Sequence, residues 1–352
     1  MKTYLINTLI NFWSSPQGPA RLYSYLRKRG VDITFLNLNH NIYSYFFSEK
    51  TIKSILEEVR PLFLSVLARD RFYRENFGSI LINSSGGKIF NLFADIISGD
   101  KKSVIDSIPF SYQIKSTIAK YKLNKGNIPY ILFGYIDEIA KRIGDTQKEI
   151  DKKFFKQSSE ELLKQVDIIL CGKAIIDAIY YPSMIDLGYG FWGCEGDVTA
   201  EDVIRSTKDE RHNYMIRFFN EQVMPQLIKE EPDIIGLSAT HPTEFSPVFT
   251  LASIIKKHLP ETHITLGGVA FSDIRTRVMK NNCLWQDIDS FVYGRGEIAF
   301  TQLIKTLDGD KNLKKVPNLI YKEKDEIIIS NNTADISPND LTVPEYVDLR
   351  PG

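Results

Sequence analysis

The chain has 352 residues, 43% of them hydrophobic and 25% charged, as in globular proteins that bury a sizeable core. Its 44 basic side chains balance 44 acidic ones, so the basic surplus typical of nucleic-acid-binding proteins is absent. No apolar run approaches the roughly 20 residues that cross a bilayer, and three dispersed cysteines exclude a disulfide framework or a compact zinc site. The composition indicates a cytoplasmic protein without nucleic-acid or membrane partners.

The N-terminal segment predicts a parallel strand–helix–strand unit. Residues 3–9 form a short apolar run of β-forming side chains, which is typical of a buried strand. Residues 19–30 carry apolar side chains at helical spacing and end at Gly30, a common helix stop. Residues 31–39 supply the second strand, and the tight connections indicate a right-handed crossover.

The middle of the chain breaks this alternation. Residues 41–212 are rich in aromatic and helix-forming side chains without a sustained strand, so we expect a mostly helical insertion. Residues 171–193 fit either a helix followed by an aromatic loop or a partly buried strand, and we favour the first interpretation.

Strands and helices alternate again from about residue 213. Three further strands, each followed by a helix, bring the total to five, and residues 316–331 predict a β-hairpin. The order predicts an α/β fold: a flavodoxin-like (Rossmann-like), doubly wound, five-stranded parallel sheet with a large helical insertion and a C-terminal hairpin. The expected domains are a split α/β domain (1–40 and 213–310), the insertion (41–212), and a hairpin with linker (311–352).

Small and polar residues follow three successive strands, at the edge where such sheets bind ligands. Glycines just past a strand let a ligand approach the backbone, and the next helix N-terminus offers free N–H groups to a phosphate. One such glycine often serves only to turn the chain, but three loops together favour a ligand. The candidates are Ser238, Thr240, His241, Gly267, Gly268, Val269, Gly294, Gly296 and Glu297.

Several stretches resemble the cobalamin-binding domain that precedes the catalytic barrel in B12-dependent radical SAM proteins. The likeness covers residues 1–50 and 170–345 and is weak through the insertion. The stretches that carry it are residues 16–39, 180–187, 225–268, 287–304 and the hairpin at 316–331.

The resemblance implies that the corrinoid's nucleotide tail lies in the strand-end crevice. Ser238 matches the serine that faces this tail, and Gly267 with Gly268 matches the glycine pair against which the tail packs. Replacing Gly268 with valine is therefore expected to block the tail and to leave the fold intact.

The resemblance also implies contacts at both ends of the corrinoid. Gly294, Gly296 and Glu297 match the turn beside the far end of the tail. The corrin ring lies over the strand ends in that family, so Trp13 and Pro16 of the first loop are expected to touch it.

The lower face of the cobalt is expected to lack a protein ligand. Related domains that coordinate cobalt carry Asp-x-His-x-x-Gly after the first strand, whereas residues 11–18 (NFWSSPQG) contain no histidine. The resemblance therefore implies cobalamin bound base-off and histidine-off. His241 is interpreted as a solvated loop residue, with cobalt coordination as the alternative.

The barrel chemistry of the family is not expected from this chain alone. Radical SAM enzymes hold a [4Fe–4S] cluster through a Cys-x-x-x-Cys-x-x-Cys loop. Cys171, Cys194 and Cys283 are dispersed, so we assign no iron–sulfur cluster, no catalytic residue and no metal ligand. The chain is either a fragment or a stand-alone module, and the expected partners are a corrinoid and a separate radical SAM barrel or substrate protein.

The leading hypothesis is a cobalamin-binding module for radical SAM chemistry such as methyl transfer. One alternative is a degenerate flavodoxin-like domain that has lost cobalamin and acts as an interaction or regulatory module. A further alternative is a flavodoxin-like domain that binds another nucleotide.

Overall fold

The structure is a computed structural model of the chain, which divides into two compact units. The first unit comprises Met1–Ile42 and Asp186–Gly352, and the second comprises Tyr43–Ile185. The structure describes residues 1–8, 17–69, 136–153, 184–186, 190–192, 199–273, 275–324 and 326–344, with residues 158, 161–162, 165–166, 168–169, 172–173, 176 and 180.

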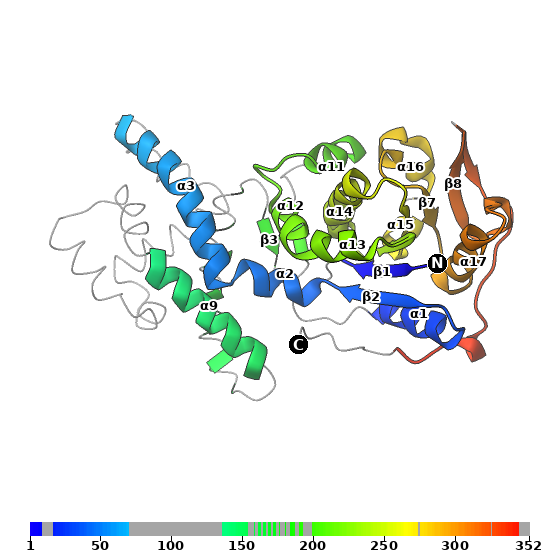
Figure 1. Cartoon of the computed structure of the whole chain (residues 1–352), viewed down its shortest axis with the longest axis horizontal. Coiled ribbons are helices and arrows are strands. Elements are labelled where there is room, and N and C mark those ends of the chain that lie inside the picture. The colour runs from blue at the N-terminus through cyan, green and yellow to red at the C-terminus, as the bar shows by residue number, and fades with distance from the viewer. Residues whose placement is uncertain are drawn as a thin grey trace. The chain divides into compact units, whose positions relative to one another are not determined.

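The first unit is built on a mixed sheet. Its strands are β1 (Thr3–Asn7), β2 (Ile33–Asn37), β5 (Ile234–Ser238), β6 (His263–Gly267), β7 (Ser290–Val292), β8 (Leu319–Glu323) and β9 (Glu326–Ile329). They lie in the order β2-β1-β5-β6-β7-β8-β9. Figure 1 labels β1, β2, β7 and β8 of this sheet. The first five in that order run parallel, and β8 and β9 add antiparallel to β7. Strands β1 and β5 are buried throughout, as expected when helices cover both faces of a sheet.

Two helices cover one face of this sheet. Helix α1 (Gln17–Lys28) contributes Tyr23 and Leu26, and helix α17 (Gly296–Asp308) contributes Leu303 to a cluster that also contains Leu5 of β1. Both helices present an apolar stripe at helical spacing and leave charged residues on the opposite side. Helices α1 and α17 therefore form the layer that covers this face of the sheet.

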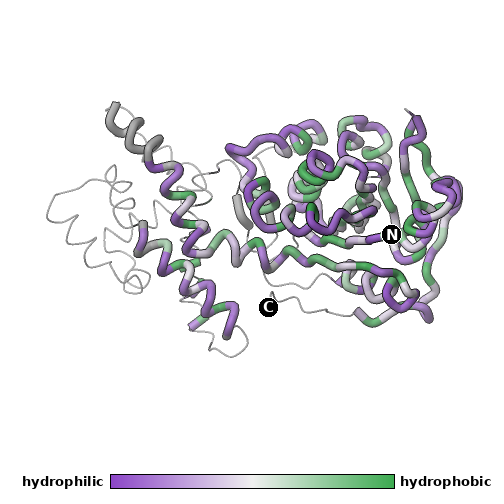
Figure 2. The backbone as a smooth tube through the Cα atoms, in the orientation of Figure 1, coloured by the Kyte–Doolittle hydropathy of each residue, from purple (hydrophilic) through white to green (hydrophobic). Residues whose placement is uncertain are grey.

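The opposite face is covered by a second layer of helices. Rings of Phe249, Phe271 and Phe291 connect the layer to β7, with centroid separations of 6.1 Å and 5.7 Å. Figure 2 shows α14 as largely hydrophobic, in agreement with its burial. The helices of this layer are α11 (Ala200–Ser206), α12 (Tyr214–Phe218), α13 (Met224–Glu230), α14 (Phe245–His258), α15 (Val269–Asp273) and α16 (Arg275–Lys280).

Several short helical turns link these elements. They are η2 (Phe219–Val223, a π-helix) and the 3-10 turns η3 (Pro242–Glu244), η4 (Asn282–Trp285), η5 (Leu313–Lys315) and η6 (Pro338–Asp340). Among the described residues, no helix is both long and apolar enough to cross a membrane.

The described part of the second unit is mostly helical. Helix α3 (Glu49–Arg69) packs against α9 (Ile136–Lys153), and α2 (Asn39–Phe46) begins in the first unit and ends in the second. A Cβ on Gly144 would lie 2.6 Å from the backbone nitrogen of Glu49, so this glycine permits the close approach of the two helices.

The structure confirms an α/β fold and corrects two details of the sequence prediction. The sheet has seven strands, because the C-terminal hairpin pairs with β7 through Phe291 and Ile320 and becomes part of the sheet. The segment expected as an aromatic loop contains two short strands, β3 (Met184–Asp186) and β4 (Gly190–Trp192).

The compact units also divide the chain differently from the expected domains. The insertion was expected over 41–212, whereas the second unit ends at Ile185. Helices α11 and α12 belong to the first unit, where both pack against α14. The hairpin and the described part of the following segment, expected as a separate region over 311–352, belong to the first unit as well.

Candidate ligand-binding cavity

A cavity of about 420 Å³ opens at the carboxyl ends of the parallel strands in the first unit. Its walls come from α1, from the start of α17 and from the loops that follow β5, β6 and β7. This volume lies within the range of roughly 300–1,000 Å³ that small-molecule and cofactor sites occupy. The place also matches the edge where open parallel sheets bind ligands.

The sheet and the ring of Phe300 form the floor of the cavity. Leu5 and Gly236 are in register on β1 and β5 and face the same side of the sheet. A Cβ on Gly236 would lie 2.8 Å from Cζ of Phe300, so the glycine lets this ring approach the sheet. Leu5, Gly236 and Phe300 therefore give the cavity an apolar floor.

A polar row crosses the carboxyl ends of the strands beside this floor. Asn37, Asn7, Ser238 and Gly267 are successive in-register neighbours on β2, β1, β5 and β6. Asn7 Nδ2 donates to Asn37 Oδ1 at 3.2 Å. Among the described residues, the buried Asn7 Oδ1 and Thr8 Oγ1 have no hydrogen-bond partner. An unpaired buried acceptor costs about 1–3 kcal/mol, and neither residue is part of the cavity lining.

The strand-end glycines fall into two kinds. Gly268 has φ +110° and Gly294 has φ +67°, conformations that side chains rarely adopt. Gly267 and Gly296 have ordinary backbone angles, and Cβ atoms there would meet their nearest neighbours at 3.6 Å and 3.5 Å. The backbone conformation therefore requires glycine at 268 and 294, whereas Gly267 and Gly296 leave space in the cavity.

The expectation that valine at Gly268 leaves the fold intact is wrong. A Cβ on Gly268 would lie 2.0 Å from the carbonyl oxygen and 2.7 Å from the carbonyl carbon of Ala239. The loops after β5 and β6 contact each other at this point, and Ala239 N donates to Gly267 O at 2.9 Å. A side chain at Gly268 therefore forces these loops apart.

The loop after β5 is held by one buried carboxyl group. Glu244 Oε1 accepts hydrogen bonds from Thr240 Oγ1 at 2.8 Å, from Thr240 N at 3.2 Å and from His241 N at 3.0 Å. Burial raises the pKa of Glu244 to about 8, so the group is mostly protonated at neutral pH. The second carboxyl oxygen has no partner among the described residues. A neutral carboxylic acid explains how this side chain is tolerated inside the protein.

His241 lies outside the cavity lining. Its side chain is exposed, and Nδ1 lies 2.9 Å from Thr243 Oγ1. Because the same nitrogen also accepts from Thr243 N at 3.4 Å, the imidazole caps the short η3 turn. The geometry gives His241 a local role in the loop.

Charged and apolar residues lie together at the mouth of the cavity. Glu297 is only 7% exposed, and its Oε1 lies 3.3 Å from Nη2 of Arg295. Its position in the first turn of α17 also stabilises its negative charge through the helix dipole. Val269 is 57% exposed, which is unusual for a large apolar side chain and gives the mouth an apolar rim.

The structure brings together eight of the eleven candidate residues. Trp13 and Pro16 lie outside the described residues, and His241 does not line the cavity. The eight that line it are Ser238, Thr240, Gly267, Gly268, Val269, Gly294, Gly296 and Glu297.

Sequence reasoning missed the wall that α1 provides. Gly18, Pro19, Arg21 and Leu22 line the cavity, but their helical spacing suggested only core and surface positions. Phe300 was missed for the same reason, since an aromatic residue in an apolar stripe is normally core. The signal that could have indicated Arg21 as a cavity residue is its basic side chain near the N-terminus of the helix that follows the first strand.

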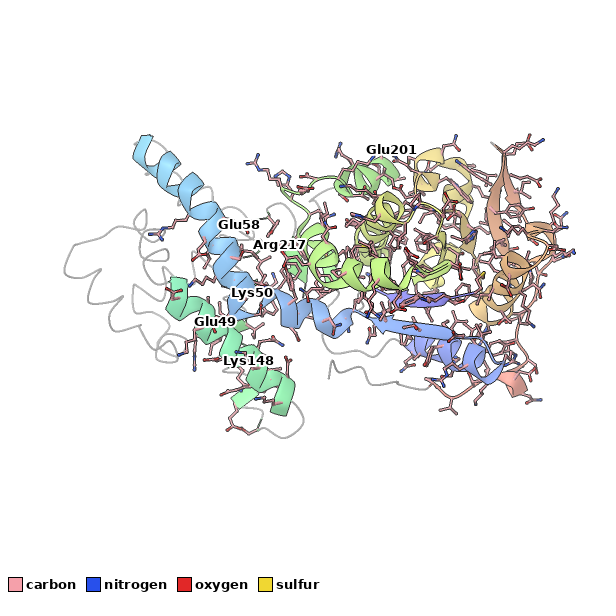
Figure 3. All side chains as sticks on the ribbon, in the orientation of Figure 1. Glu49, Lys50, Glu58, Lys148, Glu201 and Arg217 are labelled. Carbon is pink, nitrogen blue, oxygen red and sulfur yellow. The ribbon has the colours of Figure 1, made fainter. Side chains whose placement is uncertain are left out.

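The described residues offer no metal centre. No group of three or more His, Cys, Asp or Glu side chains among them could hold a metal ion. Cys171 and Cys194 lie outside the described residues. Burial raises the pKa of the Cys283 thiol, whose Sγ lies 3.9 Å from Oε1 of Glu201. Glu201 is labelled in Figure 3. A thiol in this environment is a poor nucleophile.

Comparison with known proteins gives one partial relative. No protein-family model matches the chain. Uncharacterized methyltransferase PH0819 from Pyrococcus horikoshii is 32% identical over 101 residues, which is 28% of this chain and 21% of that protein. The match thus spans about a fifth of the length of the relative.

Proposed function

We propose that the chain is a cobalamin-binding module that serves B12-dependent radical SAM chemistry, such as methyl transfer to an unactivated carbon. The observation that carries the proposal is that the residues assigned to the nucleotide tail by sequence resemblance line a single cavity. The parallel strands in the order β2-β1-β5-β6-β7 support a flavodoxin-like, doubly wound arrangement. The name of the partial relative, a methyltransferase, is compatible with this reaction class.

The residues of the cavity fit the tail of a corrinoid. Gly267 leaves space in the cavity, and Phe300 and Leu22 provide apolar contact for a flat base. Ser238 lies at the polar edge, where its hydroxyl can bind the sugar or an amide group of the ligand. The exposed Val269 at the mouth would contact the corrin ring.

Cobalamin held there would supply a cobalt centre that accepts and passes on an axial group. The chain itself would bind and orient the tail and would exclude water from the apolar floor. We propose that the lower face of the cobalt has neither the tail base nor a histidine, because the exposed imidazole of His241 is engaged with Thr243 and lies outside the cavity lining. A separate radical SAM barrel is the proposed partner for the reaction.

Equilibrium dialysis against hydroxocobalamin tests the proposal. Protein at micromolar concentration with excess cofactor should retain corrinoid, detected by its visible spectrum. Gly267→Ala adds a methyl group to the cavity wall and should reduce retention, whereas Ile228→Ala changes an exposed side chain on α13 and should not. No retention by the unmodified protein would refute the proposed function.

A further inference from the structure

Two arginines line the cavity, and they differ in their partners. Arg295 pairs with Glu297 at 3.3 Å and with Asp335 at 3.8 Å. Arg21 has no ion pair among the described residues, and its Nε is buried without a hydrogen-bond partner. A guanidinium in a partly enclosed site normally forms several hydrogen bonds, so Arg21 lacks an acceptor that a ligand could provide.

The charge balance of the cavity favours an anion. Its charged lining residues are Arg21, Arg295 and Glu297, which leave one net positive charge. The contact between Arg295 and Asp335 is weak, because Asp335 is 77% exposed and the distance is long. Arg295 can therefore turn toward a ligand and still keep its ion pair with the buried Glu297.

The N-termini of the two helices that flank the cavity add to its positive electrostatic potential. Helix α1 begins at Gln17 with no acidic residue in its first turn, and α17 begins at Gly296. Residues from the first turns of both helices line the cavity, so two positive helix-dipole ends face it. Planar guanidinium groups with such N-termini are suited to phosphate oxygens.

We propose that Arg21, together with Arg295, binds a phosphate group of the ligand, so that the cavity selects phosphate-bearing ligands over otherwise similar ones. This inference rests on the proposed function for the identity of the ligand, since the nucleotide tail of cobalamin carries a phosphodiester. The apolar floor at Leu5 and Phe300 receives the base, and the arginines at the wall and mouth receive the phosphate.

Binding of matched ligand pairs tests this inference. Hydroxocobalamin carries the phosphodiester tail, and cobinamide is a corrinoid without it. In Arg21→Met, which keeps the stem of the side chain, affinity for hydroxocobalamin should fall about ten- to hundredfold, as for loss of hydrogen bonds to a charged group. Affinity for cobinamide should be unchanged. Arg21→Lys restores the charge without the planar fork and should recover part of the loss.

Two controls separate this effect from damage to the fold. Lys28→Met removes a positive charge from the exposed end of the same helix and should leave both affinities unchanged. The hydrogen bond from Thr342 Oγ1 to the carbonyl oxygen of Arg21, at 3.2 Å, involves only the backbone of Arg21 and should survive. Arg295→Gln supplies an independent variant, and it should also lower affinity for hydroxocobalamin alone.

The outcomes distinguish this inference from the proposed function. If hydroxocobalamin binds equally to Arg21→Met and unmodified protein, the phosphate inference is refuted and the corrinoid proposal stands. If no corrinoid binds, FMN and riboflavin form a second pair that differs only by a phosphate. A preference for FMN over riboflavin that depends on Arg21 would then support the phosphate inference and refute the corrinoid proposal. If the protein preferred the phosphate-bearing ligand in neither pair, the phosphate inference would be overturned.

Discussion

Adjacent glycines at the end of β6 should respond very differently to the same substitution. In Gly268→Ala, the new Cβ would lie 2.0 Å from the carbonyl oxygen of Ala239, and the backbone holds φ at +110°. The left-handed conformation alone costs roughly 1–2 kcal/mol in an L-residue. Relief of the contact requires movement of the loop after β5. We expect a total loss of about 4 kcal/mol or more in the free energy of unfolding.

Gly267→Ala is the matched substitution one residue earlier. Its Cβ would meet nothing closer than Val292 O at 3.6 Å, and its backbone angles are ordinary. We therefore expect a change in unfolding free energy within about 1 kcal/mol. The added methyl group narrows the cavity, however, and overpacking of about 1–3 kcal/mol should weaken corrinoid binding roughly tenfold or more.

Urea denaturation followed by circular dichroism measures the first effect, and equilibrium dialysis measures the second. The expected pattern is an unstable Gly268→Ala and a stable Gly267→Ala that binds poorly. If Gly268→Ala were as stable as the unmodified protein, the assignment of Gly268 to backbone packing would be refuted. If Gly267→Ala bound the corrinoid normally, the tail would not pass this residue.

Further predictions concern pH and chemistry. Because the pKa of Glu244 is raised to about 8 in the folded state, the folded protein retains a proton that the unfolded chain loses above about 4.5. Between pH 6.5 and 8, stability should fall by about 2 kcal/mol in urea titrations, and Glu244→Gln should remove this slope. Burial lowers the pKa of His263 to about 4, so its contribution is present above pH 6.5 and is lost as the pH falls to 4. His263→Gln should abolish that acid-side loss, and an unchanged slope would contradict the assignment. Anaerobic iron–sulfur reconstitution with SAM should yield no 5′-deoxyadenosine, since the cysteines are dispersed, and robust cleavage would contradict this. Electron paramagnetic resonance of bound Co(II) should show no nitrogen triplets, whereas triplets that vanish in His241→Ala would identify His241 as the ligand.

The parallel strands could be predicted because their sequence signal is local. Residues 3–7 and 234–238 are short apolar runs, and each is buried along its length. The pairing of the hairpin with β7 could not be predicted, because it depends on contacts such as Phe291 with Ile320 between distant segments. Local sequence specifies a hairpin, but it does not specify the edge on which the hairpin docks.

The cavity residues that could be predicted are those that the order of the strands alone brings together. Ser238 and Gly267 end neighbouring parallel strands, so their proximity follows from the order of the strands. Arg21 and Phe300 were missed, because the side of a helix that faces a cavity depends on tertiary packing. The close contact of Gly268 with Ala239 was also beyond sequence reasoning, since it joins two loops that do not follow each other in the chain.

A crystal structure of the protein with hydroxocobalamin tests the central claim most directly. We predict that the nucleotide tail lies between α1 and α17, beside Phe300 and Gly267, with its phosphate within hydrogen-bonding distance of Arg21. Corrinoid density at another place on the chain, with this cavity filled only by water, would contradict it.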